Sequence, residues 1–248
     1  LGDVYKRQVL DLGCGTGSGS EVLKKNFKKA LLIGLDLSPA MLKQLQSRSR
    51  LTRPLRALCA DFHNLPLADQ SVDLVFSSLS LHWSSEPAAI IAEVRRVLRP
   101  EGLFLFSTLG PGSLASLHRS CVDNAIDMRF PDFPDLLELG NALMRTGFGE
   151  PVMDRERITL EYSSLAGLVT ELNATGIAQL IAGWDPSGAA LESARDSLYS
   201  AGKIPLPFEI QYGAAFGPAE PSKSFRDQRD TLSLSLDSLP KTGGLGYD

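Results

Sequence analysis

Apolar residues in the first part of the chain follow two different periods. Short continuous apolar runs, which are typical of strands buried on both faces, are separated by segments whose apolar residues recur at helical spacing. The runs that predict strands are 9–13, 31–35, 55–60, 72–77 and 103–108. The helices predicted between them are 19–28, 39–48 and 87–98.

Strands that alternate with helices predict an α/β fold with a doubly wound, mainly parallel sheet covered by helices on both faces. Local signals agree with this pattern. Ser38 followed by Pro39 is typical of an N-cap and the first position of a helix.

The regular alternation ends after residue 108. Helices are predicted at 112–128, 135–146, 164–175 and 189–201, and strands at 152–162 and 208–216, which brings the sheet to seven strands. The fifth and sixth strands are therefore followed by helical insertions, at about 112–133 and 163–203. Open α/β sheets bind ligands at the carboxyl ends of their strands, so we expect these insertions to form a lid over a substrate.

The domain is expected to span residues 9–217. From residue 218 to 248 the composition turns to Ser, Pro, Gly, Lys and Asp without a sustained apolar face, which predicts a disordered tail.

Composition narrows the class of protein. A hydrophobic content of 43% suits a globular core, and a net charge of −4 does not favour a nucleic-acid binder. Cys14, Cys59 and Cys121 show no metal-ligand spacing, and their odd number argues against a disulfide framework. We expect a cytoplasmic protein, because no apolar run approaches the roughly 20 residues of a membrane span and the start does not resemble a secretory signal.

A glycine-rich loop follows the first strand, with glycines at Gly13, Gly15 and Gly17. Glycines at this place let the backbone turn tightly and approach a ligand closely. A dinucleotide-binding loop would carry a further glycine where this chain has Ser18, so the spacing does not indicate a pyrophosphate site. A plain strand-to-helix turn is the alternative, and we favour the ligand-binding interpretation.

Acidic residues end the next two strands. Asp36 could accept hydrogen bonds from both hydroxyls of a ribose. The alternative role for Asp36 is to cap the following helix, but Ser38 already suits that role. Asp61 followed by Phe62 could bind an exocyclic amine and pack against an adenine ring.

These motifs resemble the class I S-adenosylmethionine-dependent methyltransferases, which have a Rossmann-like fold. The resemblance covers residues 9–108 and rests on the segments 11–17, 60–61, 65–67, 73–77 and 97–102 together with Asp36. It implies that the glycine loop lies under the methionine part, Asp36 holds the ribose, and Asp61 with Phe62 frames the adenine. The expected cofactor-binding residues are Asp11, Gly13, Cys14, Gly15, Gly17, Asp36, Leu37, Asp61, Phe62 and Ser78.

Roughly residues 9–217 are similar to the malonyl-acyl-carrier-protein O-methyltransferases of biotin synthesis. The similarity rests on the segments 76–83, 106–114, 129–130, 151–154 and 208–213. It implies methylation of the free carboxyl of a malonyl thioester on acyl carrier protein, which masks the charge for chain elongation. Members of this family carry a further segment before the first strand. We therefore expect this chain to be N-terminally truncated and to bind the cofactor more weakly.

This reaction requires little of the protein's own chemistry. A carboxylate is already an anionic nucleophile near neutral pH, so catalysis can rest on alignment and exclusion of water, and no catalytic acid or base is assigned. Arg129 is the candidate that holds the substrate carboxylate, with a surface pair to Asp127 or Asp132 as the open alternative. The other expected substrate-binding residues are His82, Trp83 and Tyr212, with a core or structural role open for the first two.

Acyl carrier proteins are acidic, so the docking face should be basic. Two clusters qualify, Arg95 with Arg96 and Arg99, and Arg155 with Arg157, and the sequence does not choose between them. No metal, nucleic acid or membrane is expected. The remaining alternatives are another methyltransferase, a related protein-arginine hydroxylase, or a non-catalytic S-adenosylmethionine-binding assembly factor.

Overall fold

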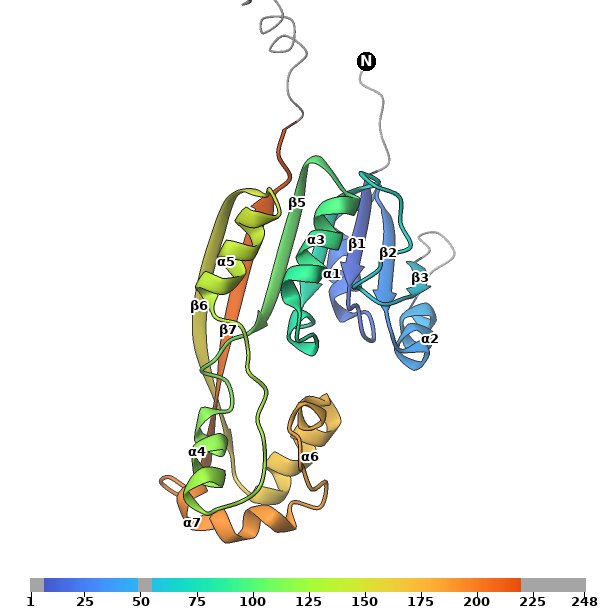
Figure 1. The fold of residues 1–248 in the computed structure, drawn as a ribbon. Coiled ribbons are helices and arrows are strands. Elements are labelled where there is room, and N and C mark those ends of the chain that lie inside the picture. The colour runs from blue at the N-terminus through green and yellow to red at the C-terminus, as the bar shows by residue number, and fades with distance from the viewer. Residues whose placement is uncertain (1–6, 49–54, 220–248) are drawn as a thin grey trace, which may run out of the picture. The chain divides into compact units, whose positions relative to one another are not determined.

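The computed structural model describes residues 7–48 and 55–219, which form a seven-stranded mixed sheet with helices (Figure 1). The strand order is β3-β2-β1-β4-β5-β7-β6, and β7 runs antiparallel to both of its neighbours. The strands are β1 (Gln8–Leu12), β2 (Leu31–Asp36), β3 (Leu55–Cys59), β4 (Val72–Ser78), β5 (Leu98–Leu109), β6 (Gly149–Tyr162) and β7 (Ile204–Phe216). The predicted α/β class, strand number and mainly parallel pairing are confirmed.

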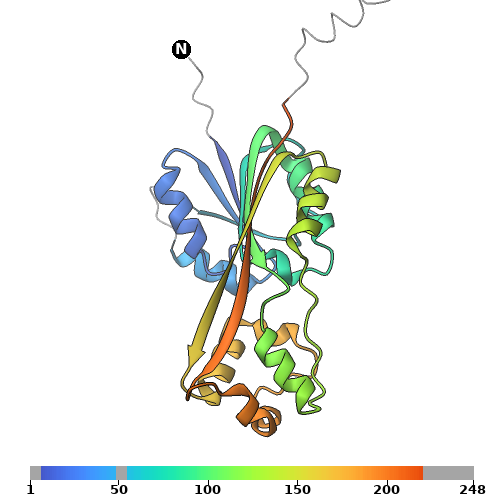
Figure 2. The ribbon, with the colours of Figure 1, turned by 90° about the vertical axis from the view of Figure 1, so that its left-hand side faces the viewer.

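Helices cover both faces of the sheet (Figure 2). On one face α1 (Ser18–Asn26) and α2 (Pro39–Ser47) pack their apolar side on alternate strand residues such as Val9 and Leu74. On the other face α3 (Pro87–Val97) and α5 (Leu136–Arg145) pack against the intervening residues, such as Leu10. Successive strand residues point to opposite faces, so continuous apolar runs are what a doubly covered sheet requires.

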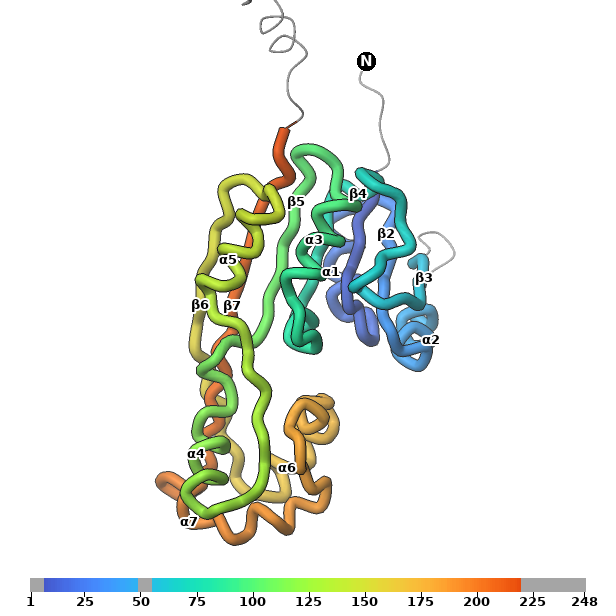
Figure 3. Tube along the Cα trace, in the orientation of Figure 1, coloured from blue at the N-terminus to red at the C-terminus, as the bar shows by residue number. Residues whose placement is uncertain are grey.

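Strand β1 lies in the middle of the sheet, and this position determines where the loops that follow the strands lie. Figure 3 follows the chain from β1 outward to β3 and then back to β4, beside β1. The order of the sheet therefore reverses at β1 and β4, and open α/β sheets bind ligands at such a reversal, outside the carboxyl ends of the strands.

The insertions form an apolar cluster of their own, distinct from the two that flank the parallel strands. The cluster is built by α4 (Ala115–Asp123), α6 (Leu165–Thr175), η2 (Ile177–Leu180), η3 (Ala189–Ala194) and α7 (Arg195–Leu198). These elements pack on the C-terminal end of β6 and the N-terminal end of β7, through residues such as Tyr162 and Leu206. Whether they act as a lid stays a prediction.

Several predicted boundaries are wrong. The helix predicted at 112–128 is helical only in α4, because Leu114 adopts a left-handed backbone before it and residues 126–134 run without helix. The helix predicted at 189–201 is a 3-10 helix followed by one short α-helical turn, and Tyr199 leaves it in an extended conformation. Strand β5 begins at Leu98, where the chain leaves α3 directly in extended form.

One prediction concerns residues that lie mostly outside the described part of the chain. The tail predicted at 218–248 falls outside the described residues from position 220 onward, as do positions 1–6 at the start. Within residues 7–48 and 55–219, no helix is long and apolar enough to cross a membrane.

Candidate functional site

The turn between β1 and α1 is shaped by its glycines. Gly13, Gly15 and Gly17 all have left-handed backbones, with φ of +70°, +52° and +92°. A Cβ on Gly13 would lie 2.7 Å from the Ser80 hydroxyl oxygen, and one on Gly17 would collide with Leu45, whereas one on Gly15 would meet nothing within 4 Å. The turn is therefore packed from behind and open over Gly15, as close approach by a ligand requires.

Backbone hydrogen bonds fasten this turn to the neighbouring strand. The amides of Gly13 and Cys14 both donate to the carbonyl of Leu35, at 2.9 Å each. Cys14 is buried, and burial raises the pKa of its thiol to about 12. Its predicted contribution to the cofactor site is thus that of backbone and packing, because the thiol does not ionise near neutral pH.

Asp36 ties the end of β2 to the glycine turn. One carboxylate oxygen accepts the amide of Gly15 at 2.8 Å, and the other accepts the amide of Ser38 at 2.8 Å. Each oxygen keeps a lone pair, so the group can still accept from a ribose. Ser38 supplies the α2 cap by accepting from Met41. Leu37, beside Asp36, is 68% exposed and offers an apolar surface at the same place.

Asp36→Asn is expected to weaken the binding of S-adenosylmethionine about tenfold, because an amide nitrogen replaces one charged acceptor. Calorimetric titration measures the affinity. Asp69→Asn is a matched control, since Asp69 is an exposed carboxylate that pairs with Arg96. An unchanged affinity in Asp36→Asn would remove this residue from the predicted site.

Asp11 is buried beneath the turn. Its carboxylate accepts the hydroxyl of Ser20 at 2.5 Å, a partner that the sequence analysis did not single out. Burial raises the pKa of Asp11 to about 6, the Ser20 hydrogen bond opposes this, and the charge of Asp36 adds to it. The buried carboxyl group of Asp11 is thus hydrogen-bonded by a residue in the first turn of α1 rather than by solvent.

Asp61 is held by the residue two positions later. Its Oδ1 accepts the backbone amide of His63 at 2.9 Å and lies 2.7 Å from the His63 Nδ1, and these hydrogen bonds lower the pKa of Asp61. His63 Nε2 is 2.7 Å from the hydroxyl of Ser84. Phe62 is half-buried against the core that contains α3 and α5. The Asp-Phe-His sequence carried a signal for this pair, which the sequence analysis missed.

The end of β4 covers the glycine turn. The Ser80 hydroxyl lies 2.5 Å from that of Ser77 and donates to the carbonyl of Leu12 at 3.1 Å, which fixes it over Gly13. Leu79 has a left-handed backbone, which is uncommon for a residue other than glycine. Ser78 is exposed at the strand end and makes no side-chain hydrogen bond with the described residues.

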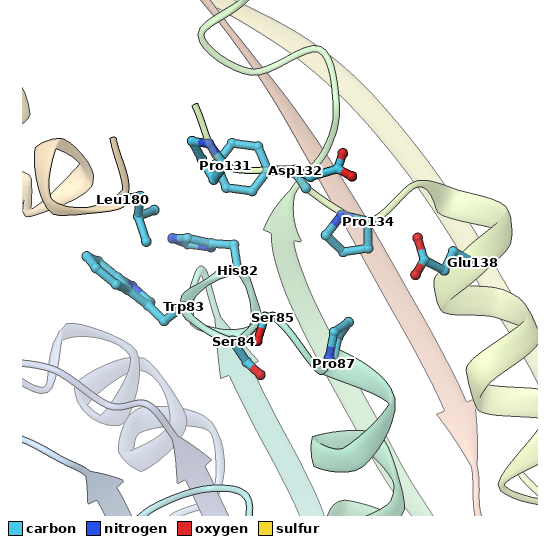
Figure 4. A pocket seen from close by; sticks show the side chains of 11 residues that line it. His82, Trp83, Ser84, Ser85, Pro87, Pro131, Asp132, Pro134, Glu138 and Leu180 are labelled. Carbon is cyan, nitrogen blue, oxygen red and sulfur yellow. The ribbon is translucent and has the colours of Figure 1, made fainter. Parts of the chain in front are cut away.

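A pocket of about 430 Å³ opens after β4 (Figure 4). It lies between η1 (Leu81–Trp83) and the segment 131–134, and α5 and η2 contribute one residue each. Its lining residues are His82, Trp83, Ser84, Ser85, Pro87, Pro131, Asp132, Phe133, Pro134, Glu138 and Leu180. The two insertions therefore meet the strand end here, and the predicted pair His82 and Trp83 lines the pocket.

His82 is 7% exposed, with Phe133 edge-on at 6.0 Å between ring centroids. Burial lowers the pKa of His82 to about 4, so its imidazole is neutral near pH 7. Its Nδ1 is buried and has no hydrogen-bond partner among the described residues. Trp83 is 42% exposed, and a Cβ on Gly176 would lie 3.1 Å from its ring, so it packs against the end of α6.

The two other predicted substrate residues do not line this pocket. Arg129 is exposed, its backbone pairs with that of Ala182 in both directions at 2.9 Å, and it makes no ion pair with Asp127 or Asp132. Tyr212 bonds through its hydroxyl to Glu156. Its substrate role gains no support from the structure.

Tyr212 points away from the pocket because of its register position. Its neighbour Gln211 donates to the carbonyl of Pro134 at 3.2 Å and thus faces the pocket wall, and successive strand residues point to opposite faces. Gln211 and the buried Glu209, which lies two positions earlier on the same strand, are residues near the pocket that the sequence analysis did not select. Among the described residues, no group of three or more His, Cys, Asp or Glu could hold a metal ion.

Known proteins match this chain in sequence and in fold. Residues 10–106 match a family model described as "Methyltransferase domain". A malonyl-acyl-carrier-protein O-methyltransferase of Laribacter hongkongensis is 39% identical, over 92% of this chain and 82% of the relative. One from Coxiella burnetii, designated 1, is 34% identical over 93% and 80%.

Solved structures agree in fold. The YcgJ protein of Bacillus subtilis has a TM-score of 0.63 at 18% identity, covering 87% of this chain and 93% of that one. Phosphoethanolamine N-methyltransferase 2 of Haemonchus contortus has a TM-score of 0.57 at 18% identity, covering 86% and 49%. At this identity the likeness concerns the fold alone.

Proposed function

The chain belongs to the malonyl-acyl-carrier-protein O-methyltransferase family, and from this premise we propose that it transfers a methyl group from S-adenosylmethionine to the free carboxyl of malonyl-acyl carrier protein. Its relatives with that name are 31% to 39% identical over most of the chain. The product is a methyl ester without the malonyl charge, suited to elongation toward biotin.

The single observation that carries this proposal is that the glycine turn and the pocket share one segment. Ser80 lies against Gly13, and within the next four positions His82, Trp83 and Ser84 line the pocket. A cofactor over the turn and an acceptor in the pocket would therefore meet at the end of β4. The alternatives of a different methyl acceptor or a non-catalytic binding protein are less favoured.

The residues present fit S-adenosylmethionine. The backbone is open to a ligand over Gly15, and Asp36 offers free lone pairs beside the exposed Leu37. Bound S-adenosylmethionine supplies a methyl on a positively charged sulfur, which a carboxylate oxygen can take without prior deprotonation. The pocket then has to orient the carboxylate and exclude water.

His82 suits that task because it is neutral. A neutral imidazole can donate one N–H to a carboxylate without protonating it, and His82 lines the pocket. Phe133, Pro131, Pro134 and Leu180 form part of the apolar cover of the pocket. We propose that the insertions act as a lid, which the contributions of Pro131, Phe133 and Leu180 to the pocket support.

The test is a comparison of three carriers. Malonyl-, succinyl- and acetyl-acyl carrier protein are each incubated with the protein and S-adenosylmethionine. The mass of each intact carrier is then measured by mass spectrometry. We expect a one-methyl shift on the malonyl carrier, less on the succinyl carrier and none on the acetyl carrier, which has no free carboxyl. No shift on any carrier from a protein that binds S-adenosylmethionine would favour the non-catalytic alternative.

His82→Phe is expected to lower kcat/KM for malonyl-acyl carrier protein about tenfold, because it removes a donor to a charged group and keeps an aromatic ring. His82→Gln retains a donor and should recover part of the loss. Steady-state kinetics give the values, and thermal unfolding shows whether either variant is misfolded. Equal rates for the wild-type protein and both variants would exclude His82 from substrate binding.

We propose acyl carrier protein as the partner and the cytoplasm as the setting. The three free cysteines among the described residues, Cys14, Cys59 and Cys121, support a reducing compartment.

A further inference from the structure

Two guanidinium groups stand out on the edge strand β6. The side chains of Arg155 and Arg157 are 65% and 66% exposed, and both form ion pairs with Glu209, at 3.9 Å and 3.8 Å. These distances exceed those of a hydrogen bond, so most of the donors of both side chains remain available to a partner.

Two of the three arginines in the other basic cluster, Arg96 and Arg99, differ in this respect. Arg96 lies 2.8 Å from Glu93 and 2.7 Å from Asp69, and it also donates to two backbone carbonyls. Arg99 lies 2.9 Å from Asp73. Both side chains are 32% exposed, and the carboxylates neutralise their charge, so they serve the packing of the fold. The structure thus distinguishes Arg155 and Arg157 from Arg96 and Arg99.

Glu209 is the fixed counter-charge beneath Arg155 and Arg157. It is 5% exposed, and its backbone exchanges hydrogen bonds with the Ser113 hydroxyl at 3.0 Å and 3.2 Å. A Cβ on Gly110 would lie 2.5 Å from one carboxylate oxygen, and a Cβ on Gly112 would lie 2.7 Å from the other. The Gly-Pro-Gly turn therefore makes room for this carboxylate. A buried charge needs a counter-charge, and the two arginines supply it from the solvent side.

The arginines lie on the face of the sheet that borders the pocket. Arg155 pairs in register with Gln211, and opposite residues of an antiparallel pair share a face. Gln211 in turn bonds to the carbonyl of Pro134, whose side chain lines the pocket. The two guanidinium groups thus lie on β6, next to strand β7, whose residue Gln211 is hydrogen-bonded to the pocket wall.

We propose that Arg155 and Arg157 form the surface on which the acidic acyl carrier protein docks, with Glu209 as their positioning residue. This inference rests on the proposed function, because it takes the carrier as the partner. Charge complementarity selects that occupant: the whole chain carries a net charge of −4, whereas these two cations are exposed beside the pocket. Complementary rim charges chiefly raise the association rate and set orientation.

The test separates docking from chemistry. Binding of fluorescently labelled holo-acyl carrier protein is measured for the wild-type protein and for R155E/R157E, and methyl transfer is measured with malonyl-acyl carrier protein and with malonyl-N-acetylcysteamine. The matched control is K28E/K29E, an equal change in net charge at two exposed lysines that lie between α1 and β2, outside both insertions.

We expect R155E/R157E to weaken carrier binding and raise KM for the carrier substrate about tenfold or more, with the rate on the small thioester within about twofold of wild type. The control should change neither. If R155E/R157E does not fold, R155Q/R157Q replaces it, and the salt dependence of carrier binding should be reduced. Equal effects in both double variants, no effect, or an equal loss on both substrates would each overturn the proposal. Wild-type protein that binds the carrier but transfers no methyl group would contradict the proposed function and leave the docking surface standing.

Discussion

Gly13→Ala is expected to lower the affinity for S-adenosylmethionine by more than about a hundredfold and to abolish methyl transfer. Gly13 has φ of +70°, and the new Cβ would lie 2.7 Å from the Ser80 hydroxyl oxygen and closer still to the Ser80 Cβ. Ser80 cannot move away easily, because it is bonded to Ser77 and to the carbonyl of Leu12. The turn itself must therefore shift, and with it the surface that the cofactor approaches.

Calorimetry and steady-state kinetics measure this effect, and Gly147→Ala is its control. Gly147 has φ of +84°, but a Cβ there would meet nothing within 4 Å. The control should lose about 1 kcal/mol of stability from backbone strain and keep its affinity for the cofactor. A Gly13→Ala protein that binds S-adenosylmethionine like the wild type would show that the turn is not the cofactor site.

Asp11→Asn is expected to raise the free energy of unfolding at neutral pH by about 3 kcal/mol. Burial raises the pKa of Asp11 from 3.8 to about 6, so the folded state holds a proton more tightly than the unfolded state. This group therefore contributes stability below about pH 4, and the contribution is lost as pH rises through about 6. Asparagine stays neutral at every pH, and its amide oxygen can still accept from Ser20.

Urea unfolding from about pH 4 to about pH 8 checks this result. The stability of the wild type relative to Asp11→Asn should fall across that range, and the gap should be largest at neutral pH. Asp61→Asn should instead lower the free energy of unfolding at neutral pH. Hydrogen bonds from His63 lower the pKa of Asp61, so its ionised form is favoured in the folded state. Parallel curves for the wild type and Asp11→Asn would contradict the assignment of a raised pKa.

Much of the fold was predictable because its signals are local. Continuous apolar runs marked the parallel strands, and Ser38, Asp135 and Ser164 start helices where their side chains accept from the first turn. The nearness of Asp36 to the glycine turn also followed from the sequence. Neighbouring parallel strands end at the same edge, and the structure joins Asp36 to the Gly15 amide.

The parts that were not predictable depend on register and on contacts between distant segments. Placing Tyr212 on the face away from the pocket required the contact between Gln211 and Pro134, which are 77 positions apart. The burial of Glu209 beneath two arginines required the pairing of β6 with β7. Composition and periodicity do not determine either register, so the sequence left Arg155 and Arg157 equivalent to the paired arginines near α3.

The central claim is that the carboxyl oxygen of the malonyl group receives the methyl. Mass alone does not test it, because methylation at the central malonyl carbon gives a product of the same mass. The decisive measurement is ¹³C NMR of the carrier-bound product formed from S-adenosylmethionine labelled with ¹³C in its methyl group. We predict a methoxy resonance that disappears on saponification. A resonance of a methyl bound to carbon, or one that persists through saponification, would contradict the proposed reaction.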